Sequence, residues 1–246
     1  GEIIQEVNKV SANEIKFEGK DVLLNFIGES IDQAFIQACV NAIGFTNEGK
    51  EDLKIVFTPI HGTSIVTIPE ALKKAGFKNV WVVEEQSNPS GEFPTVKSPN
   101  PEEPAALQMA VDLANEVGAD IVIGTDPDAD RLGIAIPKTP EKNDYLLLTG
   151  NQIATLLADY LINTEKELGK ATDRPMLVKS LVTTDLVKKI AEKNGGECRD
   201  VLTGFKYIAE EIQKIDDNPG CGRHFLFGCE ESYGFLTVPS VRDKDA

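Results

Sequence analysis

Residues 121–131 read IVIGTDPDADR and place three aspartates directly after a short apolar run. The apolar run predicts a buried strand, and Pro127 prevents a regular helix from following it. The carboxylates of Asp126, Asp128 and Asp130 occupy alternate positions in the loop, so they can converge. Like charges held that close repel one another unless a cation neutralises them, and their hard oxygen atoms suit Mg²⁺. The stretch therefore predicts a Mg²⁺ site at the C-terminal end of a strand.

Arg131 follows the third aspartate and adds a planar cation that can bind a phosphate group. A divalent cation beside an arginine is the arrangement that phosphoryl transfer requires. A solvated acidic turn is the plain alternative, in which Arg131 only forms a surface salt bridge. A calcium loop of the EF-hand type is excluded, because it needs glycine and glutamate where this chain has Arg131 and Pro137.

Outward from this loop, strand-like and helix-like segments alternate along the chain. Strands are predicted at 54–57, 80–83, 121–124, 132–136, 176–179 and 224–227, and helices at 30–43, before 75, and at 104–117, 149–163, 185–193 and 204–214. The first of these helices is expected to end at Gly44. This alternation predicts an α/β fold of two mixed, mainly parallel sheet domains with helices on both faces. Ligands bind such sheets at the C-terminal ends of the strands.

Composition narrows the classes of function. An apolar fraction of 41% in 246 residues is typical of a globular protein with room for two domains. A net charge of −15 argues against a nucleic-acid partner. No apolar run of membrane length and no signal peptide is evident, and the four cysteines form no CxxC pair. These features predict a cytoplasmic protein with reduced thiols and no membrane partner.

Several motifs resemble one enzyme family in the same order along the chain. Residues 124–132 resemble the metal-binding loop of the α-D-phosphohexomutases, the phosphoglucomutase/phosphomannomutase superfamily. Further similar stretches are TPIHGT at 58–63, EFPTVK at 92–97 with PNPE at 99–102, LTGFK at 202–206, CEESYG at 229–234 and RDKD at 242–245. The resemblance covers roughly residues 28 to 246, and the shared order makes it specific.

The resemblance also implies how the chain is divided. Family members have four domains, of which the first carries a phosphorylated serine in a TASHNP-type loop and the fourth carries a phosphate-binding basic loop. Neither loop is evident in this sequence. The chain is therefore expected to be the two middle domains of a larger enzyme. Residues 1–27 would be a linker or remnant of the preceding domain, residues 28–143 the metal-binding domain and residues 144–246 the sugar-binding domain.

Roles follow for residues that match the family motifs. Asp126, Asp128 and Asp130 would hold Mg²⁺, with a phosphoserine oxygen of the first domain as the fourth ligand. Arg131 would act on the substrate or the transferring phosphoryl group. His61, beside Gly62 in the TPIHGT stretch, is a further candidate catalytic residue, and a purely structural histidine is the alternative.

The remaining matches concern the sugar. Glu230 and Ser232 would bind sugar hydroxyls, with an acidic helix-capping turn as the alternative reading. Thr203, Gly204 and Lys206 would lie near the substrate. Lys179 is expected at the same edge of the cleft, although a lysine at a strand end can also be a solvated rim charge.

The implied activity is a Mg²⁺-dependent transfer of a phosphoryl group between the C1 and C6 (or C5) hydroxyls of a sugar phosphate through a bisphosphate intermediate. The expected partners are sugar mono- and bisphosphates and the missing N- and C-terminal domains. Two alternatives remain: a non-catalytic module that binds sugar phosphates, and a phosphatase with an aspartate nucleophile. The stretch at 92–103 is similar to the branch with phosphopentomutase-like members, and the sugar stays open.

Overall fold

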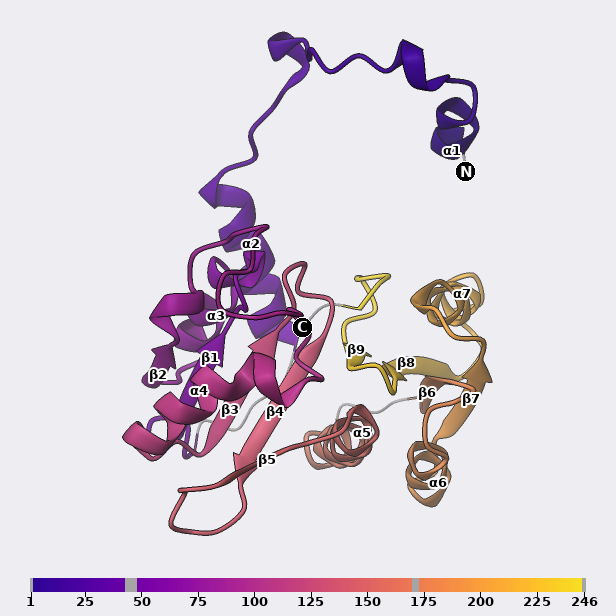
Figure 1. Ribbon diagram of the computed structural model, residues 1–246. Helices are drawn as coiled ribbons and strands as arrows, with labels where there is room; N and C mark the ends of the chain where they lie inside the picture. The colour runs from indigo at the N-terminus through magenta and orange to yellow at the C-terminus, as the bar shows by residue number, and fades with distance from the viewer. Residues whose placement is uncertain (1, 43–47, 170–172, 245–246) are drawn as a thin grey trace.

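The computed structural model describes residues 2–42, 48–169 and 173–244, and it contains two α/β domains, each built on its own sheet (Figure 1). The first sheet has the order β2-β1-β3-β4-β5 and the second has the order β7-β6-β8-β9. Four of the seven strand pairings among the described residues are parallel. The predicted fold class, two mixed sheets covered by helices, is confirmed.

The elements have the following bounds. The strands are β1 (Lys54–Thr58), β2 (Asn79–Val82), β3 (Ile121–Thr125), β4 (Leu132–Pro137), β5 (Tyr145–Leu147), β6 (Arg174–Ser180), β7 (Glu197–Val201), β8 (Arg223–Glu230) and β9 (Gly234–Leu236). The helices are α1 (Glu2–Val7), α2 (Glu29–Ala42), α3 (Ile68–Lys74), α4 (Pro104–Val117), α5 (Gly150–Glu167), α6 (Leu186–Lys193) and α7 (Phe205–Asp216). Short 3₁₀ helices occupy Ala12–Glu14, Asp21–Leu23, Thr63–Ile65 and Glu84–Gln86. The predicted end of the first helix at Ile43 and Gly44 lies outside the described residues.

Local sequence signals set the limits of the main helices. Proline occupies the first position of α4, where its missing N–H is not needed, and the helix ends at Gly118 with a left-handed φ of +65°. Helix α5 begins with a capping box in which Thr149 and Gln152 satisfy each other's backbone N–H groups. Both helices therefore begin close to where the sequence predicted.

The two cores lie between the sheets and their helices. Along β1, Ile55, Val56 and Phe57 are all buried, so both faces of the first sheet are covered. In the second domain the buried residues of β6 alternate between two faces: Leu177 packs in a core cluster with α5 and α6, whereas Met176 packs in a second cluster with α7. The second sheet therefore carries α5 and α6 on one face and α7 on the other.

The segment predicted to divide the domains lies within the first sheet. The polar segment 138–144, predicted as the division, is the turn of a hairpin in which the Lys138 N–H donates to the Asp144 carbonyl (2.9 Å). Strand β5 follows and pairs with β4, so the first sheet continues beyond the expected division at residues 143 and 144. Tyr145 is buried in the first core, where its hydroxyl donates to the Ala119 carbonyl (2.6 Å).

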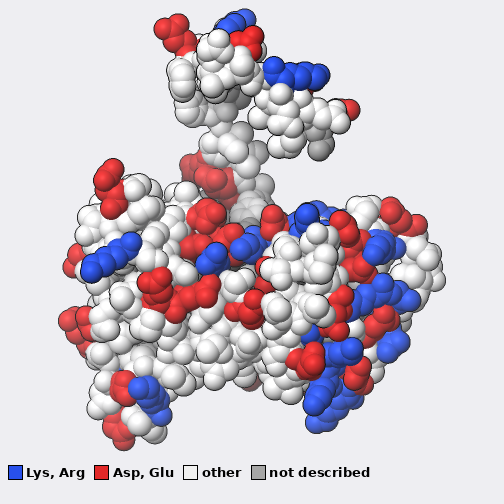
Figure 2. Space-filling view, turned by 45° about the vertical axis from the view of Figure 1, so that its right-hand side comes forward, with Lys and Arg blue, Asp and Glu red and all other residues white. Residues whose placement is uncertain are grey.

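Residues 2–28 form an arm that runs away from both sheets, drawn in indigo in Figure 1. Every residue of this arm is exposed, including Phe17 and Phe26, so it adds nothing to either core. None of the helices in the described part of the chain is both long and apolar enough to cross a membrane. On the face drawn in Figure 2, acidic and basic side chains are interspersed.

Candidate metal and sugar-phosphate site

Two loops from different domains lie side by side where their strands end. After their predicted roles, residues 126–131, which follow β3, are called the metal-binding loop, and residues 230–234, which begin with the last residue of β8, are called the sugar loop. The backbone N–H of Leu132 donates to the carbonyl of Tyr233 (3.0 Å). This hydrogen bond joins the residue after Arg131 to the residue after Ser232, so the two predicted loops lie next to each other.

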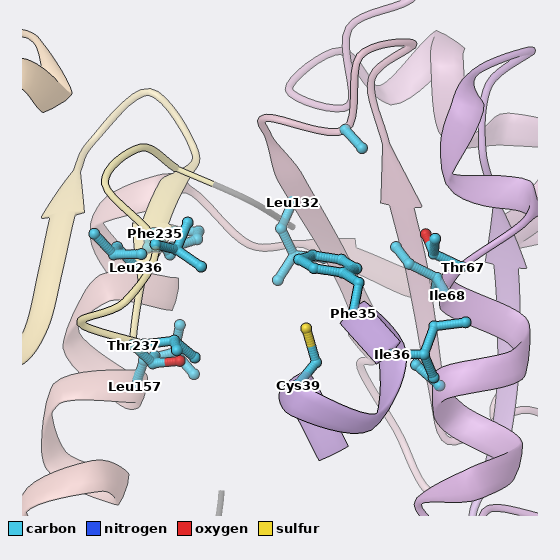
Figure 3. Close-up of a pocket in the computed structure, with 14 residues that line it drawn as sticks. Phe35, Ile36, Cys39, Thr67, Ile68, Leu132, Leu157, Phe235, Leu236 and Thr237 are labelled. Atoms are coloured by element: carbon cyan, nitrogen blue, oxygen red, sulfur yellow. The ribbon is translucent and has the colours of Figure 1, made fainter. Parts of the chain in front are cut away.

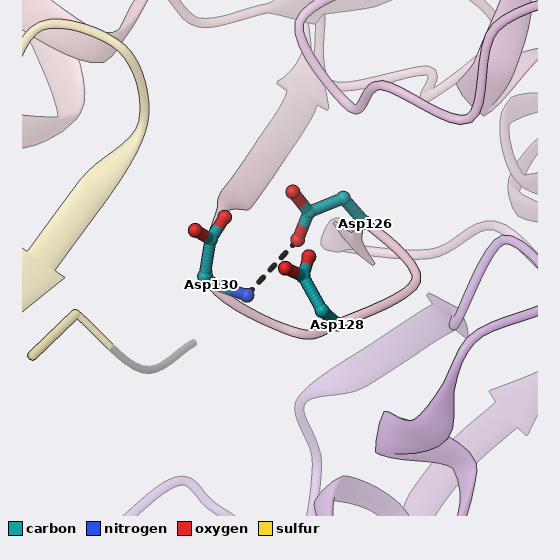
Figure 4. Close-up of side chains that lie close together, drawn as sticks. All are labelled: Asp126, Asp128 and Asp130. Carbon is teal, nitrogen blue, oxygen red and sulfur yellow. Dashed lines mark hydrogen bonds between the residues drawn. The ribbon is translucent and has the colours of Figure 1, made fainter. Parts of the chain in front are cut away.

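The three aspartates converge as the sequence predicted (Figure 4). Asp126, Asp128 and Asp130 each offer a carboxylate oxygen, and these atoms all lie within 4.8 Å of one another. The loop is closed by Asp126, whose Oδ1 accepts the backbone N–H groups of Asp130 and Arg131, each at 3.0 Å. Ala129 completes the turn with a left-handed φ of +60°. The Asp126 side chain therefore fixes the backbone of the loop that carries Asp128 and Asp130.

Burial and mutual repulsion act on the ionisation of these carboxylates. Burial, followed by the neighbouring Asp130 and Asp128, raises the pKa of Asp126 to about 7. Burial opposes ionisation of Asp130 as well, yet the Lys244 ammonium, 2.9 Å from Oδ2, helps to hold its pKa below the usual value. A divalent cation among the three oxygens would remove the repulsion, and a set of hard oxygen donors suits Mg²⁺.

Arg131 is fixed beside the carboxylates. Its Nη1 donates to Glu102 (3.1 Å), and its Nε lies 3.6 Å from Asp126 and 3.7 Å from Asp130. Among the described residues, this buried Nε has no hydrogen-bond partner. Arg131 thus forms the ion pairs of the plain alternative, and its side chain remains 34% exposed.

His61 lies behind the metal-binding loop. It is 3% exposed, its Nε2 lies 2.9 Å from the Thr95 hydroxyl, and its Nδ1 lies 3.0 Å from the Asn88 carbonyl. A Cβ at Gly62 would come within 2.5 Å of Pro127, so the backbone of the TPIHGT stretch packs directly on the loop. Both ring nitrogens of His61 have protein partners, which places this residue in a supporting position in the structure.

The sugar loop also contacts a segment that follows a third strand, β7. Glu230, the last residue of β8, is 4% exposed, and its carboxylate accepts the N–H of Gly204. Gly204 has a φ of +122°, a conformation that favours glycine. Thr203 and Lys206 flank this contact and are exposed. The structure thus brings the predicted TG-aromatic-K turn to Glu230.

Lys179 does not occupy the solvent-facing edge that the sequence suggested. It is buried, and its Nζ pairs with Asp200 (2.8 Å) and Asp185 (3.2 Å) and donates to the Thr183 carbonyl (2.9 Å). Although burial opposes its charge, these two carboxylates raise the pKa of the lysine. The Ser180 carbonyl lies 3.4 Å away as a further partner, so a substrate that contacted the ammonium group would have to displace one of these groups.

Two further residues of the motifs have roles that the sequence did not reveal. Lys244 lies in the RDKD stretch, and its ammonium reaches across the domains to Asp130. The motif match was a signal for Lys244, but nothing in the sequence connected it to the metal-binding loop. Cys229 is fully buried, and burial raises the pKa of its thiol well above the ordinary value.

A separate apolar cavity of about 280 Å³ lies between the domains (Figure 3). Phe35 and Cys39 on α2 line one side, and Leu157 and Phe235 line the other. The metal-binding carboxylates are not among its lining residues. The cavity nevertheless borders the polar site, because Ala129 of the 126–131 loop and Leu132 also line it.

Comparison with known proteins agrees with this architecture. The family described as phosphoglucomutase/phosphomannomutase, α/β/α domain II, matches residues 33–139, and domain III of the same family matches residues 149–246. A Staphylococcus aureus (strain MRSA252) phosphoglucomutase is 42% identical over 218 residues, which are 89% of this chain and 37% of that protein. The chain thus spans a little over a third of the length of this relative.

Solved structures show the same fold at lower identity. A phosphomannomutase from Thermus thermophilus, described as putative in its name, superposes with a TM-score of 0.68 at 23% identity, over 87% of this chain and 44% of the other. An Aspergillus fumigatus N-acetylphosphoglucosamine mutase in complex with glucose 1,6-bisphosphate gives a TM-score of 0.56 at 16% identity, over 83% and 37% of the two chains. Together, the two adjoining domain matches and the shared fold show that this chain belongs to the phosphoglucomutase/phosphomannomutase family, of which it carries domains II and III.

Proposed function

We propose that the chain provides the metal-binding and sugar-binding domains of a Mg²⁺-dependent phosphosugar mutase. Such an enzyme moves a phosphoryl group between the C1 and C6 (or C5) hydroxyls of a sugar phosphate through a bisphosphate. The observation that carries the proposal is the contact between the two domains at these loops, made by the Leu132–Tyr233 hydrogen bond and by the ion pair between Asp130 and Lys244 of the RDKD stretch. The S. aureus relative is named a phosphoglucomutase, and the A. fumigatus structure holds glucose 1,6-bisphosphate, which supports a hexose phosphate substrate.

The metal proposal depends on the donor set. Asp126, Asp128 and Asp130 would hold Mg²⁺ through carboxylate oxygens, which the repulsion among them already favours. Bound there, Mg²⁺ would stabilise negative charge on a transferring phosphoryl group. We further propose that a phosphoserine in the missing N-terminal domain supplies the fourth ligand and donates the phosphoryl group.

Local cations would compensate for the charge of the chain. The chain has a net charge of −15, so its overall field repels a sugar phosphate. Arg131 and Lys244 place a guanidinium and an ammonium group beside the acidic loop, and Lys206 adds an exposed ammonium near Glu230. In the proposed site, Arg131 binds the transferring phosphoryl group, and Lys206 binds the substrate together with Thr203 and Gly204.

The sugar loop would hold the ring itself. A carboxylate and a hydroxyl, Glu230 and Ser232, suit neighbouring sugar hydroxyls. A bisphosphate that returns either of its phosphoryl groups must be held in two orientations, and hydroxyls in the middle of the ring are shared by both. His61 and Lys179 have no exposed donor facing this space, so we assign them to positioning the loops. A cytoplasmic location fits an enzyme of sugar phosphates and is part of the proposal.

This chain alone is expected to show no mutase turnover, because the proposed phosphoserine and phosphate-binding loops lie in other domains. The full-length enzyme that carries these domains is expected to reach an ordinary rate, about 10 s⁻¹. Both proteins are assayed with glucose 1-phosphate, a trace of glucose 1,6-bisphosphate and Mg²⁺. Turnover by the chain alone would contradict the proposed division of labour, and a full-length protein inactive on glucose, mannose and pentose phosphates would contradict the function.

A further inference from the structure

The turn that carries Ser232 depends on its neighbours for its position. It connects β8 to β9, and Tyr233 within it has a left-handed φ of +65°. Within the described ranges, the hydroxyl of Ser232 makes no hydrogen bond of its own. The orientation of this side chain must therefore come from contacts made by the residues on either side of it.

Glu231 makes the most extensive of these contacts. Its Oε2 accepts hydrogen bonds from the hydroxyls of Ser180 (2.9 Å) and Thr183 (3.0 Å). Its backbone N–H donates to the same Thr183 hydroxyl (3.0 Å). Side chain and main chain of one residue are thus fixed by one short segment at the end of β6.

The two adjacent glutamates serve different partners. Glu230 turns toward Gly204 at the end of β7, whereas Glu231 turns toward Ser180 and Thr183 at the end of β6. The Glu231 carboxylate points toward the end of β6 and already accepts two hydroxyl donors there. It is therefore not a second sugar ligand. Its hydrogen bonds instead tie the turn to the end of β6, an inner strand of the sheet.

The segment that holds Glu231 is itself anchored. The buried Lys179 donates to the carbonyl of Thr183 (2.9 Å) and is neutralised by Asp200 and Asp185. On the other side of the turn, a Cβ at Gly150 would come within 1.9 Å of the Glu231 carbonyl oxygen. The first residue of α5 therefore packs directly on the backbone of the turn, which leaves it little freedom to shift.

We propose that Glu231, Ser180 and Thr183 form a clamp that positions Glu230 and Ser232 for the sugar, with Lys179 as its anchor. This inference rests on the function proposed above. Glu231 is then a positioning residue and not a substrate ligand. The clamp acts on the sugar loop and leaves the metal-binding carboxylates in place, because none of its members touches the metal-binding loop.

The test uses the full-length enzyme and three variants. Thr183→Val removes the hydroxyl at nearly constant volume, Thr183→Ser retains it, and Thr164→Val changes a half-buried threonine near the far end of α5 as the matched control. For each protein, kcat and KM are measured in both directions, together with the melting temperature and the affinity for Mn²⁺.

Thr183→Val is expected to raise KM and lower kcat/KM about ten- to hundredfold in both directions, as a misplaced binding group does. Mn²⁺ affinity is expected to stay unchanged, Thr183→Ser to recover most of the activity, and the control to match wild type. If Thr183→Val keeps the wild-type KM, the clamp is wrong, whether or not the variant is also less stable. The proposed function would then remain intact. A wild-type enzyme without mutase activity would overturn both.

Discussion

Replacing Asp128 with asparagine is expected to lower the Mg²⁺ affinity of this chain about 30-fold. Asp128 is exposed, so its carboxylate meets the cation in a nearly aqueous dielectric. A unit charge about 4 Å from a divalent ion contributes roughly 2 kcal/mol there, which corresponds to about 30-fold in affinity. Binding to the unsubstituted chain should itself be weak, because the proposed phosphoserine ligand lies in another domain.

The comparison is made by titrating Mg²⁺ or Mn²⁺ into the two proteins. Asp159→Asn is the matched control, since it removes an exposed carboxylate on α5 that belongs to no metal cluster among the described residues. We expect the control to bind the ion as the unsubstituted chain does. Equal affinity in the Asp128 variant would mean that the three-aspartate loop is not the cation site.

Replacing Glu230 with glutamine in the full-length enzyme should lower kcat/KM about ten- to hundredfold in both directions of the reaction. The neutral amide can still accept the N–H of Gly204 through its oxygen, so the local fold should survive. What is lost is a charge-assisted hydrogen bond to a sugar hydroxyl, worth roughly 1.5–3 kcal/mol. A group that holds the middle of the ring serves both orientations, so both directions should suffer together.

The kinetics of this variant are measured with either monophosphate as substrate. Glu210→Gln on the exposed face of α7 provides the control, and it should retain wild-type rates. A defect confined to one direction would assign Glu230 to a single orientation of the bisphosphate. Unchanged rates in both directions would remove Glu230 from the sugar site.

The sequence predicted the fold class because its main elements carry strong local signals. Thr149 with Gln152 and Pro104 mark helix starts, and the apolar run before Asp126 marks a central strand. Strand β7 lacked such a signal, because ECRDV is a polar edge strand that is stabilised by pairing with β6. Strand β5 is three residues long and follows a polar hairpin, which made that hairpin resemble a linker.

The candidate site could be predicted where all of the residues that act together lie in one short motif. The convergence of Asp126, Asp128 and Asp130 follows from their alternation within a single loop. Partnerships between distant segments could not be read in the same way. Lys179 resembled a rim charge because its partners come from other segments, and the contact of Lys244 with Asp130 depends on how the two domains pack.

The central claim is that the aspartate loop and the Glu230 loop form one site for a metal ion and a sugar bisphosphate. A crystal structure of the full-length enzyme with Mn²⁺ and glucose 1,6-bisphosphate tests it most directly. The account predicts an anomalous Mn²⁺ peak among the carboxylates of Asp126, Asp128 and Asp130, with ring hydroxyls of the same bound sugar at Glu230 and Ser232. A Mn²⁺ peak away from the three carboxylates, or a sugar bound without contact to Glu230, would contradict it.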